Sequence, residues 1–100
     1  MLKVGDWYKH FKGKSLEEKN VYEILEVGVT YSGDYGQRPL ENLVVYKNLW
    51  QNKIFTRELE DLIAELPIEK QEMYGQRYRV EKLTEEEREF VRKKLEEKLK

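Results

Sequence analysis

The chain has 100 residues, of which 39% are hydrophobic, 12% aromatic and 39% charged. This is enough apolar material for one folded domain and too many aromatic residues for a disordered chain. Its 19 basic and 20 acidic residues give a net charge of −1, without the positive excess that drives nonspecific binding to nucleic acid. The absence of cysteine excludes disulfides, thiolate nucleophiles and thiolate zinc sites.

The first half of the chain predicts two strands. Two glycines bracket the aromatic stretch 5–13, which is typical of a short strand between turns. Residues 13–20 are polar and are expected to form a loop. Residues 20–30 are rich in β-branched residues and predict the first long strand. The apolar parity of this strand changes after Ile24, which indicates a bulge or a barrel bend.

The middle of the chain predicts a hairpin, a second tight turn and one helical turn. Segment 31–38 contains two glycines and fits a hairpin loop. The apolar run 43–50 is the best candidate for a central strand, and a turn at 51–52 leads into a strand that begins near Lys53. Residues 58–63 fit a single turn of helix.

The C-terminal part predicts a short strand and then a helix. After a polar connection that contains Pro67, residues 77–82 are expected to form the final strand. Thr84 followed by Glu87 is a capping box, which predicts a helix over residues 84–100. The apolar stripe of this helix is thin, so we expect it to dock on the sheet or to pair with a partner chain.

Five short strands and one terminal helix predict a mainly β protein. We expect a small, strongly bent antiparallel barrel of about five strands, because closure leaves no open edge on short strands. The N-terminal stretch 1–13 lacks the apolar run of a signal peptide, and no part of the sequence approaches the length of a membrane span. We therefore expect a cytoplasmic protein without a membrane partner.

Three segments together resemble a bacterial family, domain of unknown function 1653. GDWYKHFKG resembles its N-terminal signature, LVVYKNLW followed by FTRELEDL its central signature, and EKQEMYGQRYRVEKL its closing strand. The resemblance runs from about Lys3 to Leu83, and it implies an SH3-like barrel domain over residues 1–83 with an appended C-terminal helix over residues 84–100. Where the family tends to carry a loop centred on His-Ser-Glu-Thr, this chain differs from residue 31 onward. The resemblance implies a functional face and no established activity.

The opening stretch supplies the first candidate ligand contacts. On a strand, alternation would place Trp7, Lys9 and Phe11 on one face, with the two aromatic residues in the core. The opposite, outward face would then offer an aromatic plane, an imidazole and an ammonium group in a row, which suit an anionic or nucleotide-like group. These outward residues are Tyr8, His10 and Lys12. Arg57 can add a bidentate fork for phosphate or carboxylate.

The resemblance extends this set to a candidate ligand-binding face. The positions that match the family's pattern are Tyr8, His10, Lys12, Tyr46 and Arg57. Tyr31 begins a segment, 31–35, that is a candidate lid. Each of these residues could instead have a structural role. The tyrosines could cover the rim or the core of the barrel, His10 could hydrogen-bond a backbone carbonyl, and Lys12 could be solvated. Arg57 could form an exposed ion pair with the nearby acidic residues.

These features predict a binding module and argue against an enzyme. One histidine and no cysteine are a poor basis for a catalytic triad or a metal site, and the six glycines form no phosphate loop or dinucleotide fingerprint. We therefore expect no cofactor, and a small anionic or nucleotide-like ligand, such as a nucleotide signal that the protein sequesters. A small barrel has little interior volume, so a sizeable pocket would form between subunits of a homo-oligomer.

Two other functions stay open at this point. Aromatic residues at loop ends could bind a peptide or partner protein in a groove. These residues are Tyr31, Tyr35 and Trp50. Stacking aromatics interleaved with lysines could instead bind RNA, which is the weakest alternative because the chain has no net positive charge.

Overall fold

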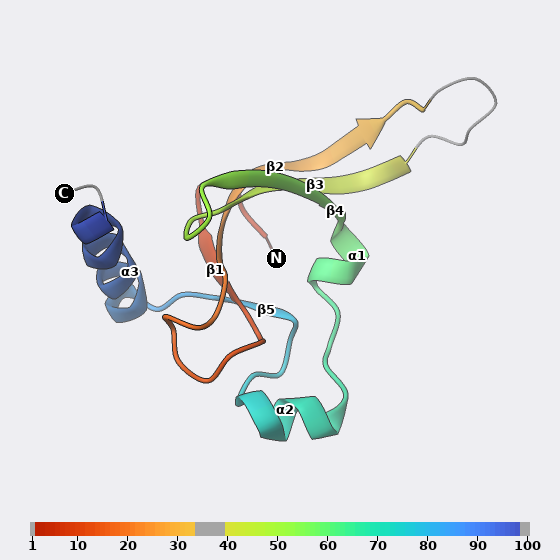
Figure 1. Ribbon diagram of the computed structural model, residues 1–100. Helices are drawn as coiled ribbons and strands as arrows, with labels where there is room; N and C mark the ends of the chain where they lie inside the picture. Colours follow the sequence, from red (N-terminus) through yellow and green to blue (C-terminus); the bar gives the residue numbers. More distant parts are fainter. Residues whose placement is uncertain (1, 34–39, 99–100) are drawn as a thin grey trace.

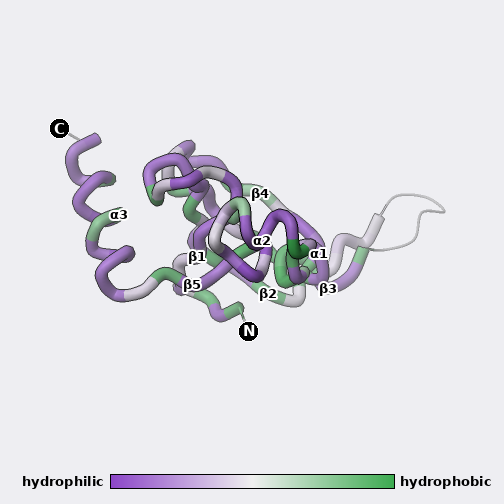
Figure 2. The backbone as a smooth tube through the Cα atoms, turned by 90° about the horizontal axis from the view of Figure 1, so that it is seen from below, coloured by the Kyte–Doolittle hydropathy of each residue, from purple (hydrophilic) through white to green (hydrophobic). Residues whose placement is uncertain are grey.

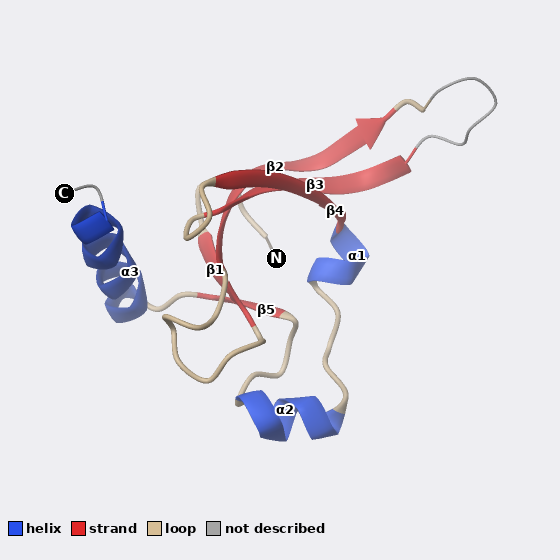
Figure 3. Cartoon of the chain, viewed as in Figure 1, coloured by secondary structure: helices blue, strands red, loops and turns tan. Residues whose placement is uncertain are grey.

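The computed structural model describes residues 2–33 and 40–98, and in this part of the chain it is a mainly β protein (Figure 1). Five strands form one antiparallel sheet: β1 (Trp7–His10), β2 (Val21–Tyr31), β3 (Leu40–Asn48), β4 (Lys53–Glu58) and β5 (Val80–Lys82). The helices are α1 (Leu59–Leu62), α2 (Ile68–Tyr74) and α3 (Glu85–Lys98) (Figure 3). The sheet order is β4-β3-β2-β1-β5, so the last strand returns to pair with the first.

The predicted strands are confirmed, with small changes at their ends. The change of parity in β2 is a break in register, because Ile24 pairs with Tyr46 whereas Glu26 pairs with Val45. The turn before β4 contains Asn52 with a φ of 56°, a left-handed conformation that asparagine tolerates better than most residues. Among the described residues the sheet stays open, with β4 and β5 as its two edges.

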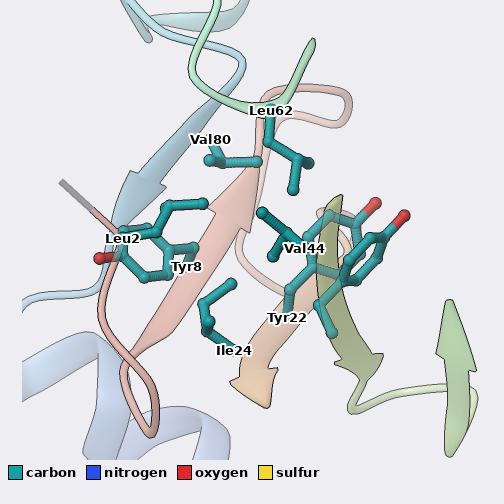
Figure 4. Packing of buried hydrophobic residues seen from close by; sticks show 8 residues of the cluster. Leu2, Tyr8, Tyr22, Ile24, Val44, Leu62 and Val80 are labelled. Carbon is teal, nitrogen blue, oxygen red and sulfur yellow. The ribbon is translucent and has the colours of Figure 1, made fainter. Parts of the chain in front are cut away.

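Apolar side chains cover both faces of the bent sheet. The inner cluster lies on the side of α1 and contains a row of buried aromatic and aliphatic residues (Figure 4). Its members are Leu2, Tyr8, Tyr22, Ile24, Val44, Tyr46, Leu62 and Val80. The outer cluster lies beneath α3, which Figure 1 shows on the opposite side of β1 from α1. Its buried members are Val21, Leu83 and Val91, against which Trp7, Leu16, Leu49, Trp50 and Leu95 pack.

The predicted capping box begins α3, and the helix docks on the sheet. Thr84 Oγ1 accepts a hydrogen bond of 3.2 Å from the Glu87 amide, and Glu87 Oε1 accepts one of 3.0 Å from the Thr84 amide. Val91 has no exposed surface, whereas most of the helix is hydrophilic (Figure 2). Of the two predicted fates, docking on the sheet is therefore observed. No helix in the described part of the chain is long and apolar enough to cross a membrane.

The polar connection expected around Pro67 contains a helix, α2, which was not predicted from the sequence. The helix begins directly after Pro67 and ends at Gly75, whose φ of 66° is left-handed. Proline before the first turn and glycine after the last are the residues that favour these two ends. None of the α2 residues is buried, so the segment lacks the apolar stripe that usually reveals a helix in a sequence.

We predict that docking of α3 depends on Val91 more than on the larger Phe90 beside it. Phe90 is 38% exposed, whereas Val91 is fully buried in the outer cluster. Val91→Ala should therefore lower the free energy of unfolding by about 2 kcal/mol, from lost burial and a residual cavity. Phe90→Ala should lower it by less than about 1 kcal/mol. Urea denaturation of both variants measures the difference, and a larger loss for Phe90→Ala would contradict the observed docking.

Candidate anion-binding site

A pocket of about 310 Å³ lies beside the inner cluster. We call it the cation pocket because lysine and arginine side chains line it. Its lining comes from four strands, the loop after β1, helix α2 and the segment before β5. The residues are His10, Phe11, Lys12, Asn20, Tyr22, Tyr46, Arg57, Lys70 and Arg79. Segments that are distant in the sequence thus contribute to one small surface.

Strands β2, β3 and β4 place a row of aromatic rings at one wall of this pocket and in the hollow beside it. Tyr46 pairs with Phe55 across β3 and β4, and their rings are stacked with centroids 5.9 Å apart. The ring of Tyr22 lies 4.5 Å from that of Tyr46. Arg57 is two residues beyond Phe55 on β4, so strand alternation places both on the same face of the sheet.

The pocket is strongly cationic, and among the described residues no carboxylate lines it. Its cations are Lys12, Arg57, Lys70 and Arg79. Within the described residues, all the ion pairs of the protein involve other basic side chains. The Nε of Arg79 is buried and has no hydrogen-bond partner there. Positive charge is therefore concentrated at a concave surface without the acidic neighbours that neutralise it elsewhere on the protein.

His10 is the neutral member of this group. Burial lowers the pKa of its imidazole to about 4, and the positive charges of Arg79, Lys12, Arg57 and Lys19 contribute to the same shift. Its Nδ1 accepts a hydrogen bond of 3.4 Å from the Lys12 amide, so the neutral ring carries its proton on Nε2. At neutral pH His10 is thus a hydrogen-bond donor without charge.

Two tyrosine hydroxyls add further donors at neutral pH. Burial raises the pKa of Tyr22, and the neighbouring Tyr46 raises it further. Burial also raises the pKa of Tyr46, although the charge of Arg57 acts in the opposite direction. Both phenols therefore keep their protons, and each can donate one hydrogen bond to an anion.

A second hollow, of about 390 Å³, adjoins the cation pocket and extends it. The two share Asn20, Tyr22, Tyr46 and Arg57. The extension adds Asn48, Gln51 and Phe55. Phe55 is 39% exposed, so part of its ring is available to a ligand. The combined surface has a charged end and an aromatic end, with Arg57 between them.

Four of the six predicted ligand-binding residues meet in this pocket, namely His10, Lys12, Tyr46 and Arg57. Tyr8 does not, because it is 6% exposed in the inner cluster and faces a separate apolar pocket. Tyr31 is 51% exposed near the end of the β2–β3 arm, which Figure 1 shows extending away from the rest of the sheet. Of the predicted lid, residues 34 and 35 lie outside the described residues.

The predicted orientation of the opening strand is wrong. Tyr8 and His10 belong to the inner face, whereas Trp7 and Lys9 face α3. Lys9 Nζ is 2.7 Å from a carboxylate oxygen of Glu87, and the guanidinium of Arg88 lies 4.7 Å from the centre of the Trp7 ring. Alternation along β1 correctly separates the residues of its two faces. Because an apolar cluster covers each face of the sheet, the sequence pattern does not tell which face is the inner one.

The orientation prediction for Phe11 is also partly wrong. Phe11 is 2% exposed as predicted, yet it lines the cation pocket together with His10. Strand β1 ends at His10, so the alternation of the strand does not continue to Phe11. Lys70 lies over the Phe11 ring, with its ammonium nitrogen 5.5 Å from the ring centre.

The contacts of Trp50 and Arg57 bear on the other functions and alternatives considered from the sequence. Trp50 packs on the outer cluster, where its Nε1 donates a hydrogen bond of 2.8 Å to the carbonyl of Lys19. Lys98 covers its ring at 4.8 Å, so Trp50 has a structural place. Tyr35, a second member of the proposed aromatic groove, lies outside the described residues. Arg57 makes no ion pair with the acidic residues around α1.

Besides Phe11, the sequence-based prediction missed four pocket residues: Asn20, Tyr22, Lys70 and Arg79. The pairing of Pro67 with Gly75 was a signal for the helix that carries Lys70. Arg79 had no comparable signal. It reaches the pocket because β5 returns to β1, where the Phe11 amide donates a hydrogen bond of 2.9 Å to the carbonyl of Arg79.

Comparison of the chain with protein-family models, curated proteins and solved structures finds no match. Among the described residues, no group of acidic or histidine side chains could hold a metal ion.

We predict that His10 makes the folded protein less stable as the pH falls through the weakly acidic range. Its pKa is about 4 in the folded chain and about 6.5 when unperturbed. Between these values the unfolded chain binds the proton more readily, so the free energy of unfolding falls as pH drops from about 6.5 to about 4. His10→Gln should lose less stability over this range, as measured by urea denaturation at each pH. Identical pH profiles would contradict the lowered pKa.

Proposed function

We propose that this protein is a noncatalytic binding module for a small anionic, nucleotide-like ligand. The observation that supports this most directly is a group of four cations in one pocket. Within the part of the chain that the structure describes, these cations form no ion pair and no carboxylate lines the pocket. An anion bound there would supply the missing negative charge. Charge-assisted hydrogen bonds from arginine are also among the strongest polar contacts in proteins.

The two ends of the pocket suggest how such a ligand lies. A phosphate or carboxylate group would meet Arg57 and Arg79, with the Nε2 proton of His10 as an uncharged donor. A flat ring would extend toward Phe55 and stack on it beside Tyr46. Arg57 is shared by the two hollows and would hold the junction between the charged and the aromatic parts.

We also propose that the bent sheet has the architecture of a small SH3-like barrel of the kind found in the domain of unknown function 1653, with β4 and β5 as its unpaired edges in the described residues. The meander of β1 to β4, followed by the return of β5 to β1, supports this proposal. The break in register after Ile24 supplies a bend in the longest strand. In a sheet bent in this way, the inner residues of several strands converge on one pocket.

Binding is tested with two probes, inorganic pyrophosphate and a nucleoside monophosphate, by isothermal titration calorimetry. We predict that Arg57→Ala weakens the affinity for both probes at least tenfold, since it removes a charge-assisted contact of about 1.5–3 kcal/mol. Arg77→Ala is the matched control, because Arg77 is exposed and pairs with Glu65 outside the pocket. Equal losses in the two variants would indicate a general charge effect and would contradict a specific site.

The aromatic end has its own test with the same probes. Phe55→Ala should weaken binding of the nucleoside monophosphate several-fold, because base stacking contributes about 1–3 kcal/mol. It should leave pyrophosphate binding unchanged, because pyrophosphate has no ring. If both probes lose affinity equally, the aromatic end is not a separate part of the site.

One observation favours a second function, a protein-interaction module. An apolar pocket of about 340 Å³ lies on the other side of the inner cluster. It is lined by Leu2, Tyr8, Ile63, Tyr78 and Val80. Tyr78 and Ile63 are 40% and 45% exposed, so a peptide could reach them. Peptide binding that survives Arg57→Ala and is lost in Tyr78→Ala would support this function over the first.

A further inference from the structure

Strand β4 is an open sheet edge that carries charged residues but has no bulge, no proline and no covering strand among the described residues. It keeps a regular register with β3 from the Asn48–Lys53 pair to the Leu43–Glu58 pair, with no bulge and no proline. No other described strand pairs with it. Ile54 is 63% exposed on this edge. Natural edge strands are generally short, bulged, covered, charged or interrupted by proline, because an open edge recruits another strand. Of these features β4 has only charge, at Lys53, Arg57 and Glu58.

The opposite edge of the sheet is different. Strand β5 has three residues, and the chain leaves it to form α3, which packs on the outer cluster. The six residues of β4 are thus the longer of the two edges in the described structure, and all but Arg57 are exposed.

We propose that β4 is a homodimer interface, at which a second copy of the chain adds its own β4 in antiparallel orientation across a twofold axis. The two sheets then become one continuous sheet. Twofold pairing uses the same surface of both copies and closes on itself, which avoids open-ended assembly. The proposal does not depend on the proposed ligand, because it rests on the unpaired backbone and the side chains of this edge.

The symmetry restricts the register. In an antiparallel pair, opposite residues both direct their backbone groups toward the partner or both away from it. Along β4, every second residue directs its backbone groups toward the open edge. Two residues can therefore lie opposite each other only if their numbers are both even or both odd. The twofold axis then passes through a residue and not between two residues. An axis at Phe55 would place Lys53 opposite Arg57, and an axis at Arg57 would place two guanidinium groups opposite each other. Like charges in opposite positions are destabilising.

An axis at Thr56 avoids these repulsions and pairs most of the strand. Thr56 then faces its own copy, Ile54 faces Glu58 of the partner subunit, and Phe55 faces Arg57 of the partner subunit. Threonine pairs and arginine against an aromatic ring are both favourable neighbours. Both Phe55 and Arg57 line the extended pocket, so each subunit adds a contact beside the other's aromatic end.

The proposal is tested by sedimentation of the full chain in chloride buffer without phosphate or nucleotide. The unmutated chain should form a dimer of about twice 12.2 kDa. Thr56→Lys and Thr56→Glu should each sediment as monomers, because each places like charges opposite each other at the axis. An equal mixture of the two variants should restore the dimer, since opposite charges then meet.

Thr30→Lys is the matched control, because Thr30 is also an exposed strand threonine but lies on β2, two strands from the open edge. It should leave the dimer intact, and circular dichroism should show all variants folded. A monomeric unmutated chain, a dimer that persists in Thr56→Lys, or a mixture that stays monomeric would each overturn the proposal. Probe titration reports on the pocket and sedimentation on the edge, so the two proposals can fail separately.

Discussion

The pairing of β5 with β1 is the contact on which the candidate site depends. It aligns Val80 with His10 and places Arg79 beside Phe11. Gln76, which is 3% exposed, stabilises this return because its Nε2 lies within hydrogen-bond distance of the carbonyls of Lys9, Tyr78 and Arg79. Buried carbonyl groups need donors, and a single amide side chain serves three of them here. Without this return, the segment with α2 and Arg79 would have no fixed relation to the first strand.

The same contact explains the unusual electrostatics of the pocket. It brings two basic residues of the C-terminal half beside two that are already near β1 and β4, and it brings no carboxylate with them. Lys12 and Lys70 are exposed, whereas His10 is buried. Burial lowers the pKa of His10 to about 4, so its imidazole is neutral at neutral pH. Concentrated like charge lowers the stability of a folded chain, and an anion that binds only the folded state restores it. Under the proposed function, ligand binding would therefore raise the stability of the folded chain at this surface.

Strand β4 connects the pocket with the open edge. Its inner side chains, Phe55 and Arg57, line the hollows, while its free backbone faces away from β3. Helix α3 covers the outer face of the sheet only over β1 and β2. It does not reach β4, most of which is exposed. In the proposed dimer, a partner strand at β4 would extend the sheet and would also lie beside the proposed ligand surface, because Phe55 and Arg57 belong to both.

Local pattern was sufficient for most elements of the fold. The strands, the bulge after Ile24 and the capping box at Thr84 depend on neighbouring residues, so they could be read from the sequence. Helix α2 could not be recognised from an apolar stripe, because none of its residues is buried. The predicted barrel would close only if β4 paired with β5. These strands are distant along the chain, and in the described residues they do not pair with each other.

The sequence by itself determined which residues have the chemistry to bind an anion, and it identified four of the pocket residues: His10, Lys12, Tyr46 and Arg57. Only the tertiary structure decided which of the candidates meet. Alternation assigned Tyr8 and His10 to one face, yet the bend of the sheet directs Tyr8 to an apolar pocket and His10 to the cationic one. The reason is that alternation along a strand predicts only which side of the sheet a residue faces. Whether that residue belongs to a site depends on the distant segments that pack against the same side.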